Sequence, residues 1–135
     1  MEKRIAKRAL RILIADDSAV VRDRLGHMVS QVASVGIVHQ ARDVAGTLAA
    51  LRDEVLDLLI LDIQMPGGSG LDVLRVAKQN SPAPIVIMLT DYPYPQYKEK
   101  CLELGADHFF SKSTNSTVLL TLIENLARPK GNSDE

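Results

Sequence analysis

Four short, mostly apolar runs along the chain each end directly before a polar residue. The runs cover residues 10–15, 58–61, 85–89 and 109–111. Apolar runs of this length are typical of strands that are buried on both faces of a parallel sheet. The residues that follow them are Asp16 with Asp17, Asp62, Thr90 and Lys112. Because the carboxyl ends of parallel strands face one crevice, we expect these carboxylates, the hydroxyl and the ammonium to lie together.

The segments between the runs have the periodicity of amphipathic helices, and residues 35–40 form a further expected strand. Ser18 is a candidate helix cap and Gly105 a candidate helix terminator. The positions that mark the five helices are Val21, Leu25, Met28, Val29 and Val32; Val44, Leu48, Leu51 and Val55; Leu71, Leu74 and Ala77, after a start near Ser69; the weaker segment 96–104; and Leu119, Leu122, Ile123 and Leu126. This alternation predicts a three-layer α/β sandwich around a five-stranded parallel sheet with right-handed crossovers.

The composition of the chain narrows the classes of protein to which it can belong. The chain has 135 residues, of which 46% are hydrophobic, and this suits one domain with its own core. The net charge of −1 gives no reason to expect nucleic acid or a membrane as a partner. The single cysteine, Cys101, excludes a disulfide framework and fits a small buried position better than a redox sensor. His27, His39 and His108 do not have the spacing of metal ligands.

The expected organisation has three parts. Residues 1–9 are a basic N-terminal extension, residues 10–128 form the folded domain, and residues 129–135 form a polar tail that we expect to be disordered. The first apolar run is short and ends in two aspartates, so it is neither a signal peptide nor a membrane span. We therefore expect a cytoplasmic location.

Four motifs, in this order, carry a resemblance to a known family. They are Ala15-Asp16-Asp17-Ser18, the segment 62–70 (Asp-Ile-Gln-Met-Pro-Gly-Gly-Ser-Gly), Leu89-Thr90, and the segment 105–112 (Gly-Ala-Asp-His-Phe-Phe-Ser-Lys). From about residue 10 to residue 128 the chain resembles the receiver domain of response regulators in two-component signalling, here of the single-domain type. The resemblance implies a flavodoxin-like (βα)5 fold with the sheet order 2-1-3-4-5.

The resemblance also implies a role for each residue of the expected cluster. Asp62 has the place of the phosphoacceptor, and Lys112 would pair with a phosphoryl oxygen. Thr90 would form a hydrogen bond to another phosphoryl oxygen, and Phe109 has the place of the aromatic residue that rotates on activation. Mg²⁺ prefers hard oxygen ligands, and the implied ones are Asp16 through water, Asp17, Asp62 and the backbone carbonyl of Gln64.

The function implied in this way is that of a phosphorelay switch. The chain would accept a phosphoryl group from a sensor histidine kinase or a histidine phosphotransfer protein and then act on a downstream protein partner. It would do so as a monomer or as a phosphorylation-dependent dimer, with no nucleic-acid or membrane partner. It would catalyse only its own phosphorylation and dephosphorylation and would otherwise not be an enzyme.

Two positions depart from the family pattern. Ser113 follows Lys112 where receivers usually have proline, commonly with a cis bond, and Asp91 follows Thr90 where a small residue is usual. These departures leave open a phosphorylation-independent scaffold or binding module of the same fold. A flavodoxin-like redox protein is a third class, although no Thr/Ser-rich phosphate loop follows the first strand. Taken alone, residues 16–18 could also be no more than a helix N-cap.

All aromatic residues lie between positions 92 and 110, and they are Tyr92, Tyr94, Tyr97, Phe109 and Phe110. Tyrosines that are clustered outside a core favour a partner surface. We therefore expect Tyr92, Tyr94, Tyr97 and Phe109 to contact the partner. The alternative is a solvated tyrosine loop with Phe110 in the core.

Overall fold

The computed structural model describes residues 9–127. Residues 1–8 and 128–135 lie outside the described residues, and they include almost all of the expected basic extension and the whole of the expected tail. The three-part division of the chain therefore stays a prediction.

A five-stranded parallel sheet forms the middle layer of the molecule. Its strands are β1 (Leu10–Ala15), β2 (Val35–Ala41), β3 (Leu58–Leu61), β6 (Ile85–Thr90) and β7 (His108–Ser111). Their order is β2-β1-β3-β6-β7, and each neighbouring pair is parallel. The flavodoxin-like order predicted from the sequence is confirmed.

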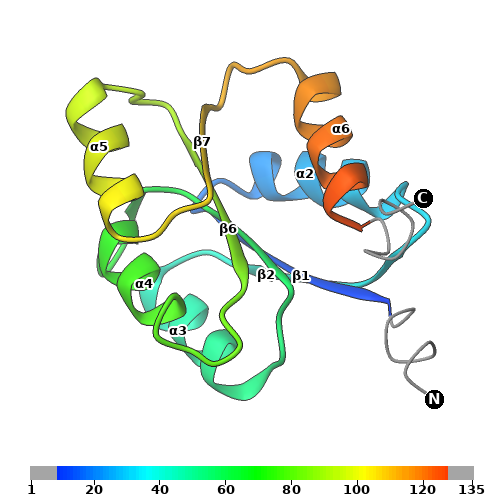
Figure 1. Ribbon diagram of the computed structural model, residues 1–135, viewed down its shortest axis with the longest axis horizontal. Helices are drawn as coiled ribbons and strands as arrows, with labels where there is room; N and C mark the ends of the chain where they lie inside the picture. The colour runs from blue at the N-terminus through cyan, green and yellow to red at the C-terminus, as the bar shows by residue number, and fades with distance from the viewer. Residues whose placement is uncertain (1–8, 128–135) are drawn as a thin grey trace, which may run out of the picture.

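Five helices cover the two faces of this sheet. They are α2 (Ala19–Ser30), α3 (Val44–Asp53), α4 (Gly70–Ala77), α5 (Pro95–Glu103) and α6 (Ser116–Ala127). Figure 1 shows α3, α4 and α5 on one side of the sheet and α2 and α6 on the other, which gives the three expected layers. None of the described helices has the length and apolar character needed to cross a membrane.

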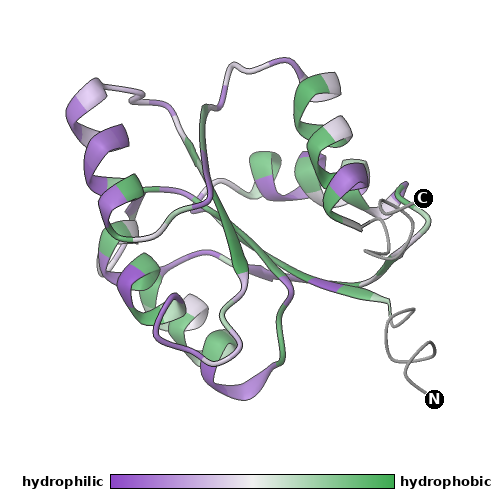
Figure 2. Ribbon diagram, viewed as in Figure 1, coloured by the Kyte–Doolittle hydropathy of each residue, from purple (hydrophilic) through white to green (hydrophobic). Residues whose placement is uncertain are grey.

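The central strands are buried on both faces, as their uninterrupted apolar runs predict. In β1, Leu13 packs into the cluster on the α3–α5 side, whereas Ile12 and Ile14 pack into the cluster on the α2–α6 side. All three side chains are fully buried. Figure 2 shows the strands as mostly hydrophobic and α5 as the most hydrophilic helix, in agreement with the weak apolar pattern of segment 96–104.

Three details differ from the sequence-based expectation. Val55 lies beyond the end of α3 and is exposed, because the chain is already extended at Glu54. The strand β7 is only partly buried, since it lies at the edge of the sheet with β6 as its single neighbour. The segment after β3 forms a small antiparallel hairpin of β4 (Gln64–Met65) and β5 (Gly68–Ser69).

Candidate functional site

The polar residues that follow the strands lie together at the carboxyl edge of the sheet. Asp16 and Asp17 follow β1, Asp62 follows β3, Thr90 ends β6 and Lys112 follows β7. Each of the carboxylates of Asp16, Asp17 and Asp62 offers an oxygen within 4.8 Å of the other two. Parallel pairing of neighbouring strands explains this, because it places the residue after each strand at the same edge.

The loop between β1 and α2 holds Asp16 in a buried position. Asp16 is 2% exposed, and its Oδ1 accepts a hydrogen bond from the backbone N–H of Ser18 at 2.9 Å. The hydroxyl of Ser18 in turn caps α2 by accepting from the N–H of Val21 at 3.2 Å. Ser18 is therefore the N-cap of α2, as the sequence allowed, and this cap lies next to the acidic cluster without replacing it.

Lys112 links the two buried carboxylates. Its Nζ lies 2.7 Å from Oδ2 of Asp16 and 2.9 Å from Oδ2 of Asp62, and the lysine side chain is only 9% exposed. Asp91, which is exposed, approaches the same Nζ at 3.9 Å from the rim. One ammonium thus neutralises part of the repulsion between two carboxylates that the fold brings close together.

Burial and pairing act against each other on the protonation of these groups. Burial raises the pKa of Asp62, and the nearby charge of Asp16 adds to this, while the hydrogen bond and charge of Lys112 partly oppose it. Burial alone would lower the pKa of Lys112, but its bonds to Asp16 and Asp62 outweigh burial and leave the pKa above its ordinary value. Lys112 is therefore a cation at neutral pH.

The segment after Asp62 folds closely against it. A Cβ at Gly70 would collide with the carbonyl oxygen of Asp62, so only glycine fits at the start of α4. The backbone N–H of Gln64 lies 3.4 Å from Oδ1 of Asp62, which is a long hydrogen bond. The side chain of Gln64 is exposed, and the role of its carbonyl as a metal ligand stays a prediction.

Thr90 is fully buried beside the cluster. Its Oγ1 accepts a hydrogen bond from the backbone N–H of Tyr92 at 3.1 Å, so the hydroxyl holds the start of the loop between β6 and α5. Phe109 is partly buried and packs against the core cluster on the α3–α5 side. Thr90 therefore lies at the start of the segment that carries the tyrosines, and Phe109 lies on the neighbouring strand β7.

The three tyrosines lie together at the start of α5, where the rings of Tyr92 and Tyr94 are stacked and that of Tyr97 is tilted against Tyr94. The ring centroids of Tyr92 and Tyr94 are 6.3 Å apart, and those of Tyr94 and Tyr97 are 5.8 Å apart. Tyr92 and Tyr94 are about half exposed, whereas Tyr97 packs against the core. Phe110 packs on the opposite, α2–α6 side of the sheet. Of the four residues predicted to contact a partner, Tyr92 and Tyr94 are exposed, whereas Tyr97 and Phe109 are partly buried, and the partner surface stays a prediction.

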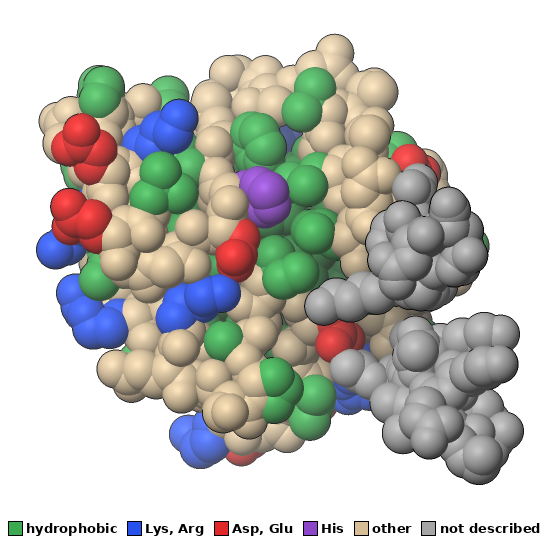
Figure 3. All heavy atoms as spheres, in the orientation of Figure 1, with side chains coloured by type: hydrophobic (Ala, Val, Ile, Leu, Met, Phe, Trp, Pro, Cys, Tyr) green, Lys and Arg blue, Asp and Glu red, His purple; other side chains and the backbone are tan. Residues whose placement is uncertain are grey.

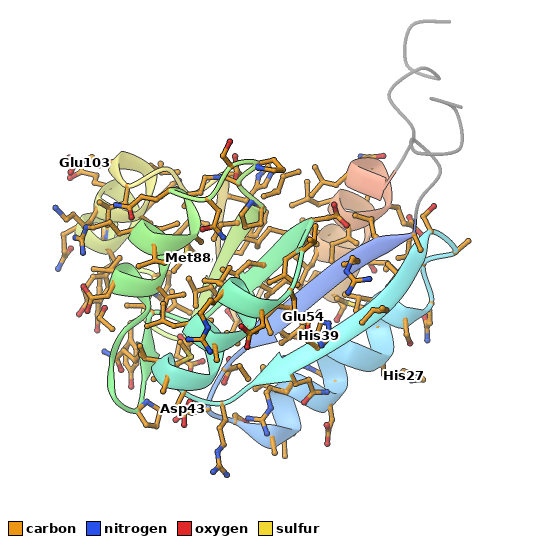
Figure 4. All side chains as sticks on the ribbon, turned by 90° about the horizontal axis from the view of Figure 1, so that it is seen from below. His27, His39, Asp43, Glu54, Met88 and Glu103 are labelled. Atoms are coloured by element: carbon orange, nitrogen blue, oxygen red, sulfur yellow. The ribbon has the colours of Figure 1, made fainter. Side chains whose placement is uncertain are left out.

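The edge strand β7 contributes a second apolar area. Figure 3 shows hydrophobic side chains and a histidine gathered between α5 and α6. On β7 itself, the rings of His108 and Phe110 stack with centroids 6.3 Å apart. Figure 4 shows that His27 and His39 come from separate elements, and His39 points toward Glu54, with 3.6 Å between Nε2 and Oε1.

The chemistry of the donor set fits a hard cation. Within residues 9–127, Asp16, Asp17 and Asp62 form the one cluster of His, Cys, Asp or Glu side chains that is compact enough to hold a metal ion. All of its donors are carboxylate oxygens, which suit Mg²⁺ or Ca²⁺ better than a transition metal. Cys101 is fully buried away from the cluster, and burial raises the pKa of its thiol to about 11, which suppresses thiolate chemistry at neutral pH.

One contributor to the site had no signal in the sequence. Nη1 of Arg22 donates to the backbone carbonyl of Asp16 at 2.8 Å, and Nε of the same side chain donates to Gln40 at 3.1 Å. Arg22 thereby ties α2 to the acidic loop and to β2. No spacing rule relates an arginine on a helix to a backbone carbonyl six residues earlier, so sequence reasoning missed it.

Comparison with curated proteins finds relatives that are longer than this chain. A protein-glutamate methylesterase/protein-glutamine glutaminase of Treponema denticola is 33% identical over 123 residues, which are 88% of this chain and 33% of that protein. The sensory transduction protein LytT of Enterococcus faecalis is 30% identical over 122 residues, which are 90% of this chain and 50% of that protein. The chain therefore spans a third to a half of these relatives.

Two solved structures with the same fold match this chain over nearly their full length. A CheY-like response regulator receiver domain protein from Methanospirillum hungatei superposes with a TM-score of 0.81 at 28% identity, over 88% of this chain and 94% of that one. The receiver domain of an HD domain-containing protein from Pseudomonas fluorescens gives a TM-score of 0.80 at 27% identity, with the same two coverages. The response regulator receiver domain family matches residues 12–124. This chain therefore belongs to the response regulator receiver domains, the signalling switches of two-component systems.

Proposed function

We propose that this receiver domain accepts a phosphoryl group on Asp62 and switches a partner-binding surface. The observation that carries the proposal is the arrangement around Asp62. It is a buried carboxylate, one oxygen of which lies 2.9 Å from the ammonium of Lys112, and two further aspartates lie beside it. Phosphoryl transfer depends mainly on positioning and on neutralising charge, and this cluster offers both.

The transfer itself is a displacement at phosphorus. A carboxylate oxygen of Asp62 forms a bond to the phosphorus atom of a phosphohistidine donor. The bond between phosphorus and the donor nitrogen breaks, and the imidazole keeps the electron pair. The product is an acyl phosphate on Asp62 and a free histidine on the donor, which is a sensor histidine kinase or a histidine phosphotransfer protein.

The acidic residues would hold a Mg²⁺ ion during this step. Asp17 and Asp62 are the proposed carboxylate ligands, with Asp16 acting through water and Gln64 through its carbonyl. The bound ion supplies positive charge that offsets the charge on the transferred group. Lys112 already lies between Asp16 and Asp62, so its ammonium has only a short way to move to a phosphoryl oxygen on Asp62.

Output would begin at Thr90. Its hydroxyl now accepts from the N–H of Tyr92, and a phosphoryl oxygen on Asp62 would offer it a charge-assisted bond as donor. A shift of Thr90 toward the phosphate would loosen the loop that carries Tyr92 and leave room for Phe109 to turn. The rings of Tyr92, Tyr94 and Tyr97 would then change their positions relative to a partner.

A direct experiment tests phosphoryl acceptance. The protein is incubated with acetyl phosphate and Mg²⁺ and weighed intact, and we expect one added phosphoryl group. The addition should be absent when EDTA replaces Mg²⁺. A protein that gains no phosphoryl mass under these conditions would support the second candidate.

The second candidate is a phosphorylation-independent scaffold of the same fold. The observation that favours it is the rim position of Asp91, 3.9 Å from Nζ of Lys112, where its charge opposes an incoming phosphoryl group. NMR spectra with and without beryllofluoride separate the candidates, because a scaffold would show no response. In a switch, the changes should reach residues 92–110 and α6, and Thr90→Ala should confine them to the metal pocket.

A further inference from the structure

The turn after β7 is held by the side chains of two serines. Oγ of Ser111 accepts a hydrogen bond from the backbone N–H of Ser113 at 3.1 Å. The same oxygen lies 2.8 Å from Oγ of Ser113, so the two hydroxyls are bonded as well. Lys112 is the residue between them. Ser113 occupies the position at which receiver domains usually have proline.

The backbone around Lys112 is bonded on both sides of the residue. The N–H of Lys112 donates to the carbonyl of Thr90 at 2.8 Å, which ties it to β6. The N–H of Thr114 donates to the carbonyl of Ser111 at 2.9 Å and closes a tight turn over residues 111–114. The serine hydroxyls add side-chain hydrogen bonds to this turn, because the short side chain of serine can bond to nearby backbone groups.

The direction of this turn matters because of the side chain that it carries. Lysine is a point charge on a flexible stem, so its Cα–Cβ direction and its rotamers together decide where the ammonium lies. In this site the ammonium must stay within hydrogen-bond distance of two oxygens at once, at 2.7 Å and 2.9 Å. A turn that can swing would spread the ammonium over many positions.

We propose that Ser111 is a positioning residue for Lys112, since its hydroxyl fastens the turn that aims the lysine ammonium at Asp16 and Asp62. The inference deepens the proposed function, on which its kinetic test rests. The side-chain hydrogen bonds of Ser111 are made to Ser113 and not to Asp16, Asp17 or Asp62. Its effect on the reaction therefore passes through the lysine.

The kinetic test compares variants of Ser111 in the full chain, with acetyl phosphate as the donor and Mg²⁺ present. Ser111→Ala should lower the phosphorylation rate on the order of three- to tenfold, which corresponds to the net free energy of one hydrogen bond. Ser111→Thr keeps the hydroxyl and should restore the rate. Ser113→Ala keeps the backbone N–H and should have a smaller effect. Ser116→Ala is the matched control, because the hydroxyl of Ser116 forms no hydrogen bond with the described part of the chain.

If Ser111 only positions Lys112, its removal should slow phosphorylation without weakening Mg²⁺ binding. A general disturbance of the site would weaken both. Mg²⁺ affinity, measured by NMR titration without any phosphoryl donor, should not be lower in Ser111→Ala than in wild type. An equal loss of Mg²⁺ binding and of phosphorylation in Ser111→Ala would overturn the inference. So would a wild-type rate in that variant.

A second readout does not depend on phosphorylation. The ion-paired ammonium of Lys112 should give a protected ¹⁵Nζ signal, which is identified by its loss in Lys112→Met. Ser111→Ala should broaden or remove this signal and Ser111→Thr should keep it. An unchanged ¹⁵Nζ signal in Ser111→Ala would overturn the inference, whether or not the wild-type protein accepts a phosphoryl group. If the wild-type protein accepts no phosphoryl group but the signal behaves as expected, only the proposed function is contradicted.

Discussion

The acidic site has an inner and an outer half that differ in burial and pairing. The inner half consists of Asp16, Asp62 and Lys112, which are almost fully buried and share two short ion pairs. The outer half consists of the exposed Asp17, Gln64 and Asp91. Within residues 9–127 the side chain of Asp17 has no hydrogen bond or ion pair.

The difference follows from the cost of burying charge. A buried carboxylate must be paired within the fold or it destabilises the fold, and so the inner half comes with its own cation. An exposed carboxylate keeps its water and needs no partner, so Asp17 stays available to an ion from solution. The fold thus fixes the carboxylate that would carry the phosphoryl group, together with its ion-pair partner, and leaves free a carboxylate that would recruit the metal.

The largest expected effect comes from removing the acceptor in the inner half. Asp62→Asn should abolish Mg²⁺-dependent phosphorylation, because an amide oxygen cannot form the acyl phosphate. Intact mass spectrometry after incubation with acetyl phosphate measures this. Asp72→Asn, at an exposed position on α4, is the control and should be phosphorylated like wild type. Undiminished labelling of Asp62→Asn would refute the assignment of the acceptor.

Removing the cation of the inner half should destabilise the fold. Lys112→Met leaves two buried carboxylates without a counter-charge, and we expect the free energy of unfolding in EDTA to fall by about 3 kcal/mol. Added Mg²⁺ should recover part of the loss, since a cation can again lie between the carboxylates. Urea denaturation measures both values. Lys98→Met, at an exposed position on α5, is the control, and equal stability of Lys112→Met and wild type would contradict the pairing.

The outer half should control metal binding with little effect on the fold. Asp17→Ala should weaken Mg²⁺ binding by about tenfold or more, given that even supporting residues of metal sites have effects of this size. Because the chain has no tryptophan, the titration is followed by NMR. Asp23→Ala, exposed on α2, is the control. Without metal, Asp17→Ala should be slightly more stable than wild type, because repulsion between the carboxylates is relieved. An unchanged Mg²⁺ titration in Asp17→Ala would show that Asp17 is not a metal ligand.

A smaller effect concerns alkaline pH. The folded pKa of Lys112 lies above its ordinary value because its bonds to Asp16 and Asp62 outweigh its burial. The stability that Lys112 contributes is therefore fully present below its unfolded pKa of about 10.4 and is lost as the pH rises through the folded pKa. The difference in stability between wild type and Lys112→Met should be constant from about pH 8 to about pH 10 and should then shrink. A difference that already shrinks below this range would contradict the raised pKa.

The smallest expected effect belongs to Asp91. Its carboxylate is exposed and lies 3.9 Å from the lysine ammonium, so Asp91→Asn should change the free energy of unfolding by less than about 0.5 kcal/mol. The phosphorylation rate should rise about twofold, because one negative charge near the incoming phosphoryl group is lost. Asp91→Glu keeps the charge and should behave like wild type. A large gain in rate would contradict the weak influence that its exposed position predicts for Asp91.

Much of the fold and the composition of the cluster were predictable from local patterns. Uninterrupted apolar runs indicated parallel strands, and polar residues directly after the runs indicated a shared edge. Helix starts at Ser18 and Ser69 were also correct, because a capping hydroxyl acts within its own turn. These features depend on residues that are neighbours in the sequence, and for that reason the sequence alone determined them.

The tertiary structure decided how the charges are shared. It made Lys112 bridge Asp16 and Asp62, kept Asp17 exposed, and placed Arg22 on the carbonyl of Asp16. It also left β7 at the edge of the sheet and ended α3 before Val55. These outcomes depend on distances between segments up to 96 positions apart, as between Asp16 and Lys112, and on which rotamer of a long side chain finds a partner. No local pattern contains that information, because burial and pairing are properties of the assembled layers.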